Sequence, residues 1–152
     1  MLLFDFFLIS LQLSGCSLIE LTEFANIKSS KTNKKTAVMI NLQKGQRIEI
    51  GLSKVGVGLG WDPNESTGYA FDLDASAFML GGNKKLPKDE FFVFYNNPLS
   101  PDQAVQSSGD DTTGGNSDGG DDETLTVDLT KVDPNIQEII FTVTIHEAEA
   151  RK

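Results

Sequence analysis

The stretch IIFTVTI, residues 139–145, decides the fold class. Every second position from Ile139 to Ile145 holds a large apolar residue, which is the period of a β-strand with one buried face. The same alternation recurs at residues 47–52, 71–74 and 124–129. About six short strands of this kind, separated by Gly, Asn and Pro, predict an all-β domain, and specifically a β-sandwich.

The N-terminal part of the chain differs in composition from the rest. Residues 1–13 are strongly apolar, yet this run is too short to span a bilayer as a helix. Residues 28–36 (KSSKTNKKT) are polar and typical of a linker. We therefore predict that residues 1–38 are a non-domain N-terminal extension and that residues 39–152 form the domain. Met39 is then the expected start of translation.

A lipid-anchored or secreted protein is the alternative for this region. The sequence Leu-Ser-Gly-Cys that ends at Cys16 resembles a bacterial lipoprotein cleavage box. However, no Lys or Arg precedes the apolar run and Asp5 lies within it, and both features are wrong for a signal peptide. We expect a cytoplasmic protein that does not contact a membrane unless Cys16 is lipidated.

The C-terminal end of the sequence lies close to a predicted strand. The chain stops a few residues after its strongest predicted strand, residues 139–145. A sandwich that ended there would leave a strand edge short of pairing partners. We therefore expect the domain to be truncated at its C-terminus.

The charge of the chain is concentrated in one segment. The formal net charge is -9, which disfavours nucleic acid and anionic membranes as partners. Between Lys88 and Lys131 there is no Lys or Arg, while ten Asp and Glu residues occur there. Such an unbalanced block is either disordered or neutralised by a bound cation. The single cysteine, Cys16, excludes an internal disulfide.

Asp72 and Asp74 are the first candidate ligands of a cation. Residues two apart on a strand point to the same face, about 7 Å apart, so their carboxylates repel each other unless a cation lies between them. Calcium fits this pattern because it takes six to eight oxygen ligands in irregular arrangements. An isolated Asp-x-Asp would more often be a solvated strand face.

Further oxygen donors follow in the sequence. Asn96 and Asn97 come directly after the aromatic strand predicted at residues 91–95, and two glycine-rich acidic loops occupy residues 109–114 and 118–123. Glycines let such loops fold tightly, so that their carboxylates converge. Oxygen donors without nearby Cys or His argue against zinc and copper. The donors are numerous enough for two adjacent calcium ions.

Two other interpretations of the acidic residues stay open. A disordered acidic loop would account for the composition alone. A metal-dependent hydrolase could use the same carboxylates, although the sequence presents no evident nucleophile or proton shuttle. We therefore expect a binding protein and not an enzyme.

Several short motifs, in this order, resemble the TerD-type tellurium-resistance proteins. They are Gly58-Leu59-Gly60-Trp61-Asp62, Phe71-Asp72-Leu73-Asp74-Ala75-Ser76, Phe94-Tyr95-Asn96-Asn97, Ser100-Pro101-Asp102, Gly120-Asp121-Asp122-Glu123 and Thr144-Ile145-His146-Glu147-Ala148-Glu149-Ala150-Arg151. The likeness covers residues 39–152, and the combination of motifs is highly specific.

This resemblance implies a calcium-binding β-sandwich from a bacterial tellurium-resistance or stress-response system. It implies calcium as the cofactor and other proteins of the same system as partners. By motif position, it implies metal ligands among Asp72, Asp74, Asn96, Asn97, Asp110, Asp111, Asp121, Asp122 and Glu123.

Overall fold

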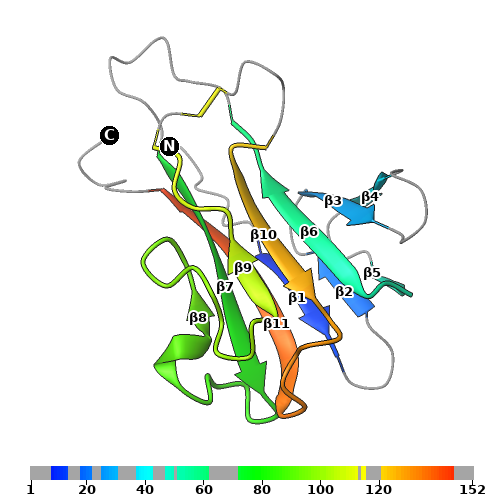
Figure 1. Cartoon of the computed structure of the whole chain (residues 1–152). Helices are drawn as coiled ribbons and strands as arrows, with labels where there is room; N and C mark the ends of the chain where they lie inside the picture. Colours follow the sequence, from blue (N-terminus) through cyan, green and yellow to red (C-terminus); the bar gives the residue numbers. More distant parts are fainter. Residues whose placement is uncertain are drawn as a thin grey trace, which may run out of the picture.

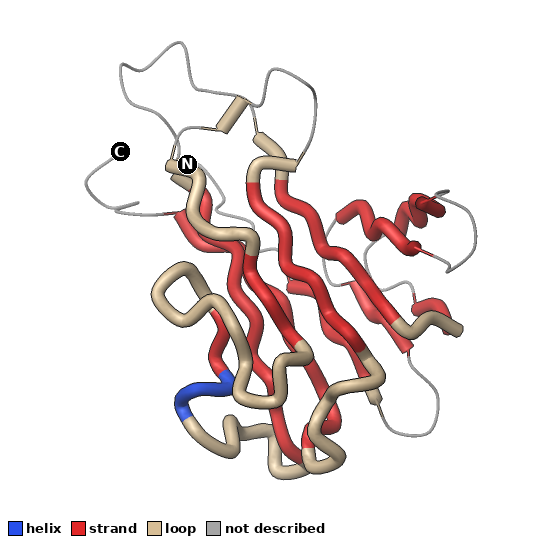
Figure 2. The backbone as a smooth tube through the Cα atoms, in the orientation of Figure 1, coloured by secondary structure: helices blue, strands red, loops and turns tan. Residues whose placement is uncertain are grey.

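The computed structural model contains two antiparallel β-sheets (Figures 1 and 2). It describes residues 8–13, 18–21, 25–30, 37–42, 47–49, 51–61, 72–112, 114–115 and 121–145. Cys16 and Asp118 lie outside these residues. The elements are β1 (Leu8–Gln12), β2 (Leu18–Leu21), β3 (Ala25–Ser30), β4 (Ala37–Leu42), β5 (Arg47–Glu49), β6 (Lys54–Leu59), β7 (Leu73–Gly81), the 3₁₀ helix η1 (Asp89–Phe91), β8 (Phe92–Val93), β9 (Val105–Ser107), β10 (Glu123–Asp128) and β11 (Ile136–Ile145).

The two sheets form a sandwich, which confirms the predicted all-β fold. One sheet has the strand order β5-β2-β1-β11-β7-β8, and the other has the order β4-β3-β6-β10-β9. In Figure 1, the sheet with β6, β10 and β9 lies in front of the sheet with β1, β11 and β7. Within the described part of the chain, no helix is long and apolar enough to cross a membrane.

The core lies between the two sheets and follows the period-two pattern of the sequence. Leu125 and Val127 of β10 are buried, while Thr124 before them is half-buried and Thr126 between them is exposed. On the facing sheet, the fully buried side chains include Met79 of β7. Removing these apolar side chains from water supplies the main stabilisation of the sandwich.

Strands from the first 38 residues, which we predicted to be a non-domain extension, lie in both sheets. β1 pairs antiparallel with β11, and Leu11 lies opposite Ile139. Both of these side chains are fully buried in the core. β3 pairs with β6 of the other sheet. β11 pairs with β7 along one edge. The backbone N–H and C=O groups along its other edge also need hydrogen-bond partners, and β1 supplies them.

A buried carboxylate also ties β1 to β11. Glu138 accepts hydrogen bonds from Ser10 Oγ at 2.5 Å, Gln12 Nε2 at 2.7 Å and Lys84 Nζ at 2.7 Å. Burial favours the neutral acid, but these hydrogen bonds and the charge of Lys84 outweigh it and hold the pKa of Glu138 below its usual value. Glu138 is therefore a charged residue held between two strands and the β7–η1 loop.

The strand registers bring the start of β7, the end of β6 and the start of β10 to one end of the sandwich. Glu123, the first residue of β10, pairs with Leu59, the last residue of β6. The Glu123 side chain also accepts a hydrogen bond from the backbone of Ala75, near the start of β7. The candidate metal site lies at this end.

Candidate metal centre

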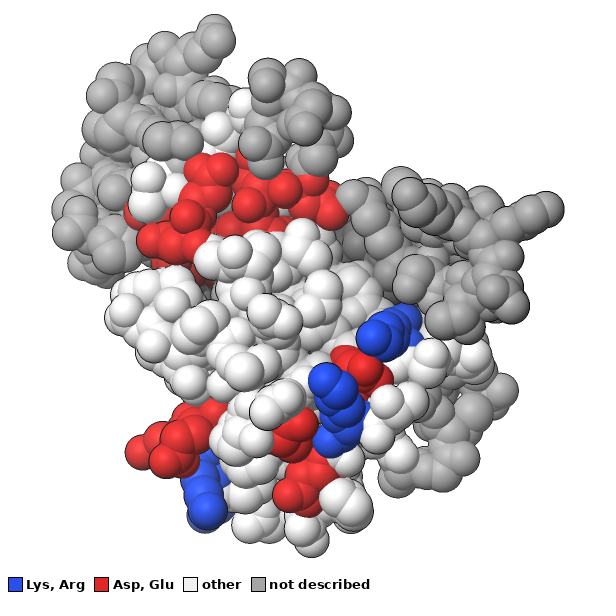
Figure 3. Space-filling model, in the orientation of Figure 1, with Lys and Arg blue, Asp and Glu red and all other residues white. Residues whose placement is uncertain are grey.

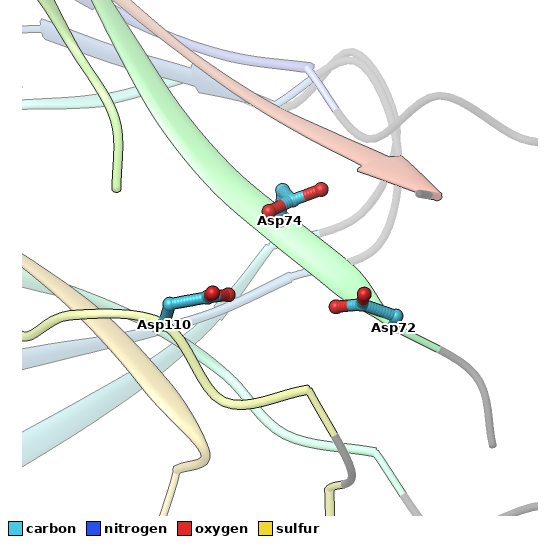
Figure 4. Close-up of side chains that lie close together, drawn as sticks. All are labelled: Asp72, Asp74 and Asp110. Atoms are coloured by element: carbon cyan, nitrogen blue, oxygen red, sulfur yellow. The ribbon is translucent and has the colours of Figure 1, made fainter. Parts of the chain in front are cut away.

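Three carboxylates converge at this end of the sandwich. Asp72 precedes β7, Asp74 lies on it, and Asp110 lies in the loop between β9 and β10. One oxygen of each carboxylate lies within 4.8 Å of those of the other two. Figure 4 shows Asp110 lying across from the two side chains on the β7 segment. The group joins a strand of one sheet to a loop that leaves the other sheet.

The geometry of this group fits a metal ion. Calcium–oxygen distances are about 2.3–2.6 Å, so oxygens on opposite sides of one calcium ion lie about 5 Å apart. The three oxygens therefore lie within reach of a single ion. Without one, two unit charges at this separation repel by roughly 3 kcal/mol at the effective dielectric constant of a protein surface. Asp72 is buried, Asp74 is half-buried and Asp110 is exposed.

Glu123 lies beside this group in the interior of the sandwich. Its carboxylate accepts hydrogen bonds from the backbone N–H of Ala75 at 2.7 Å and of Asp111 at 3.3 Å. The side chain is almost completely buried. The pKa of Glu123 is raised from 4.5 to about 7, chiefly by burial and also by the charges of Asp74 and Asp110, while the two backbone hydrogen bonds act in the opposite direction.

This raised pKa predicts a pH dependence of the metal-free protein. Between pH 4.5 and about 7 the folded state holds a proton on Glu123 that the unfolded state has released. The free energy of unfolding should therefore fall as the pH rises through this range. Thermal unfolding in a chelating buffer measures the effect, and Glu123→Gln should reduce the slope. A melting temperature of the wild-type chain that rises over this range would contradict the assignment.

Asp111 and Asp122 use their carboxylates to hold the acidic loops in place. Asp111 Oδ1 accepts a hydrogen bond from Gly114 N at 3.0 Å, and Asp122 Oδ2 accepts one from Trp61 N at 2.9 Å. The backbone N–H of Asp122 also donates to Leu59 O at 2.8 Å. The contact of Asp111 lies within its own loop, and those of Asp122 connect the start of β10 to the end of β6. The ligand role predicted for both residues stays a prediction.

Asn96 and Asn97 lie in a turn that follows β8. The backbones of Phe94 and Asn97 form an isolated β-bridge, and Asn96 is exposed. Asn97 Nδ2 donates hydrogen bonds to the carbonyls of Glu90 at 3.0 Å and Phe92 at 2.6 Å. The recorded contacts of this amide therefore stabilise its own turn, and its role as a metal ligand stays a prediction.

Residues 38–152 of the chain match the TerD domain family. The chain belongs to this family. The match begins one residue before the predicted domain start at Met39, and it also covers all nine predicted ligand positions.

Several TerD-domain relatives are known by name. The chain is 48% identical over 118 residues to the uncharacterized protein YceE of Bacillus subtilis (strain 168). It is 46% identical to general stress protein 16U of the same organism and 44% identical to the tellurium resistance protein TerD of Serratia marcescens, in each case over 118 residues. Each alignment covers 74% of this chain and 60% of the relative. The chain thus spans about 60% of the length of these relatives.

The TerD domain contains two glycine contacts whose role the sequence did not reveal. A Cβ atom on Gly58 would collide with the carboxylate of Asp121, and one on Gly114 would collide with the indole of Trp61. Gly114 also has a φ of +67°, a conformation that side chains other than glycine rarely adopt. From the sequence alone, the glycines of residues 55–60 are typical of a glycine-rich strand. The spacing of Gly56 and Gly58 was the signal available in the sequence, because it puts both glycines on one face of β6 and leaves that face open to a close neighbour.

The charges on the TerD domain are distributed unevenly. Figure 3 shows acidic side chains gathered over the end where β7 and β10 begin, with Lys side chains toward the opposite end. At that opposite end, signs are mixed, as in the pair Lys54 Nζ–Asp128 Oδ2 at 3.2 Å. The carboxylate group of Asp72, Asp74 and Asp110 therefore lies in a region of strongly negative potential, which attracts cations.

Proposed function

We propose that this chain is a calcium-binding protein of a bacterial tellurium-resistance or stress-response system, acting by binding and not by catalysis. The observation that carries the proposal is the convergence of Asp72, Asp74 and Asp110 from two sheets onto a space that fits one ion. The names of the relatives, which include tellurium resistance and general stress proteins, support the biological setting.

The chemistry of the ligands favours calcium over other metals. The group consists only of carboxylates, and hard oxygen donors suit calcium or magnesium better than zinc or copper. Magnesium demands shorter distances and near-octahedral geometry, and it usually binds one or two carboxylates and several waters. A site with three carboxylates on a strand end and a loop suits the larger and less demanding calcium ion.

The structure supports one ion more directly than two. The three-carboxylate group accounts for one site among the described residues. A second calcium ion would have to use the acidic residues around it, and this part of the proposal rests on the number of oxygen donors alone. We further propose that the chain acts in the cytoplasm and contacts other proteins of its system. The resemblance to TerD-type proteins supports both points.

Isothermal titration calorimetry on the intact chain tests the proposal. After treatment with a chelator, calcium should bind saturably and at least about tenfold more tightly than magnesium, because the site does not impose the octahedral geometry that magnesium requires. Absence of saturable calcium binding, or equal affinity for the two ions, would contradict the proposal.

A further inference from the structure

Glu123 connects the two sheets beside the carboxylate group. It is the first residue of β10 in one sheet, and only 3% of its surface is exposed. Its Oε2 atom accepts a hydrogen bond from Ala75 N of β7, in the other sheet. β8 pairs with β7 only from Ala77 onward, at Ala77 and Phe78. At Ala75, the backbone N–H therefore donates to the Glu123 side chain and not to the backbone of a neighbouring strand.

Each hydrogen bond of Glu123 lies next to a carboxylate of the group. Ala75 follows Asp74, and Asp111 follows Asp110. Oε2 therefore fixes the backbone next to Asp74. Oε1 accepts a hydrogen bond from Asp111 N at 3.3 Å and fixes the backbone next to Asp110. The Glu123 side chain thus sets the distance between β7 and the β9–β10 loop, which are not joined by strand pairing at this point.

Glu123 is close to the three carboxylates but does not belong to their group. Its hydrogen bonds to the backbone N–H groups of Ala75 and Asp111, which follow Asp74 and Asp110 in the sequence, place it beside the group. The residues whose oxygens all lie within 4.8 Å of one another are Asp72, Asp74 and Asp110, and the described residue Glu123 is not among them. A carboxylate that accepts hydrogen bonds from backbone groups beside the ligands acts as an outer-shell group.

We propose that Glu123 is a positioning residue that holds Asp74 and Asp110 at calcium-binding distance across the two sheets and does not itself contact the ion. This inference rests on the proposed calcium function. It changes the role expected for Glu123, which the family resemblance implied to be a ligand. Outer-shell partners of metal ligands typically contribute 10–100-fold to metal affinity.

Two substitutions of Glu123 separate the effect of the position of its carboxylate from the effect of its charge. Glu123→Gln keeps the size of the side chain but replaces one hydrogen-bond acceptor by a donor that faces a backbone N–H. Glu123→Asp keeps the charge but withdraws the carboxylate by one methylene group. Each should weaken calcium binding about tenfold, whereas Glu90→Gln, an exposed control, should have little effect. If Glu123→Gln does not fold, Glu123→Asp provides the same test.

Terbium luminescence distinguishes a positioning residue from a ligand. The emission lifetimes of Tb³⁺ in H₂O and D₂O report the number of water molecules bound to the ion. We expect Glu123→Gln and Glu123→Asp to keep the wild-type water number, and Asp74→Asn to increase it. A water number that rises in the Glu123 variants would overturn the proposal, as would unchanged calcium affinity in both. Failure of the proposed function itself looks different, because the wild-type chain would then bind neither calcium nor terbium.

Discussion

Replacing Asp72 by asparagine is expected to weaken calcium binding roughly a hundredfold, which corresponds to about 2.7 kcal/mol. The substitution exchanges a charged oxygen ligand for a neutral one at the buried member of the three-carboxylate group. The same change removes repulsion among the three carboxylates in the metal-free state. The melting temperature of the variant should therefore rise in a chelating buffer and respond less to added calcium. Calorimetric titration and thermal unfolding measure the two effects.

Asp128→Asn provides the matched control for this substitution. Asp128 lies at the opposite end of β10, where hydrogen bonds from Thr130 and Lys54 hold its pKa below the usual value. Its substitution removes one negative charge from the protein without touching the candidate site. Calcium affinity should therefore remain close to that of the wild-type chain. Equal losses in Asp72→Asn and Asp128→Asn would indicate a diffuse acidic surface and not a site.

Calcium is expected to stabilise the folded chain strongly. At a hundredfold excess over its dissociation constant, a ligand that binds only the folded state adds about 2.7 kcal/mol to the free energy of unfolding. For a domain of this size, this corresponds to an increase in melting temperature of about 5–10 °C. The structural reason is that the ion would join β7 of one sheet to the β9–β10 loop of the other.

The control for this effect is a sodium salt at matched ionic strength. Sodium screens the acidic surface but should not bridge Asp74 and Asp110, so it should raise the melting temperature much less than calcium does. A melting temperature that is unchanged by millimolar calcium, or that rises equally with both salts, would contradict the assigned site.

The part of the fold that could be predicted is the part indicated by local alternation of apolar and polar residues. Residues 124–129 and 139–145 show the period-two pattern, and both form strands of the sandwich, β10 and β11. The pairing of Leu8–Gln12 with β11 could not be predicted in this way. Strand partners far apart in the sequence are chosen by tertiary packing, and the composition of residues 1–38 predicted a non-domain extension instead. Local patterns thus predicted the strands but not their neighbours.

The candidate site could be predicted in part for a similar reason. The Asp-x-Asp spacing put Asp72 and Asp74 on one face, and the density of acids indicated the loop that holds Asp110. The path of that loop determines which carboxylates accept backbone hydrogen bonds, as those of Asp111 and Glu123 do. Such contacts depend on the folded positions of residues far apart in the sequence, so residue types alone could not separate ligands from supporting groups.

The most direct test of a localised calcium site is a calcium titration of the isotopically labelled chain followed by ¹H–¹⁵N NMR. The account predicts saturable shifts of the backbone amides of residues 72–75 and 110–112, with those of Lys88 and Asn135, in loops away from the cluster, nearly unchanged. Small, non-saturating shifts spread over all acidic segments, including Asp89, Asp102 and Asp128, would mean that calcium only screens the surface, and they would contradict the central claim.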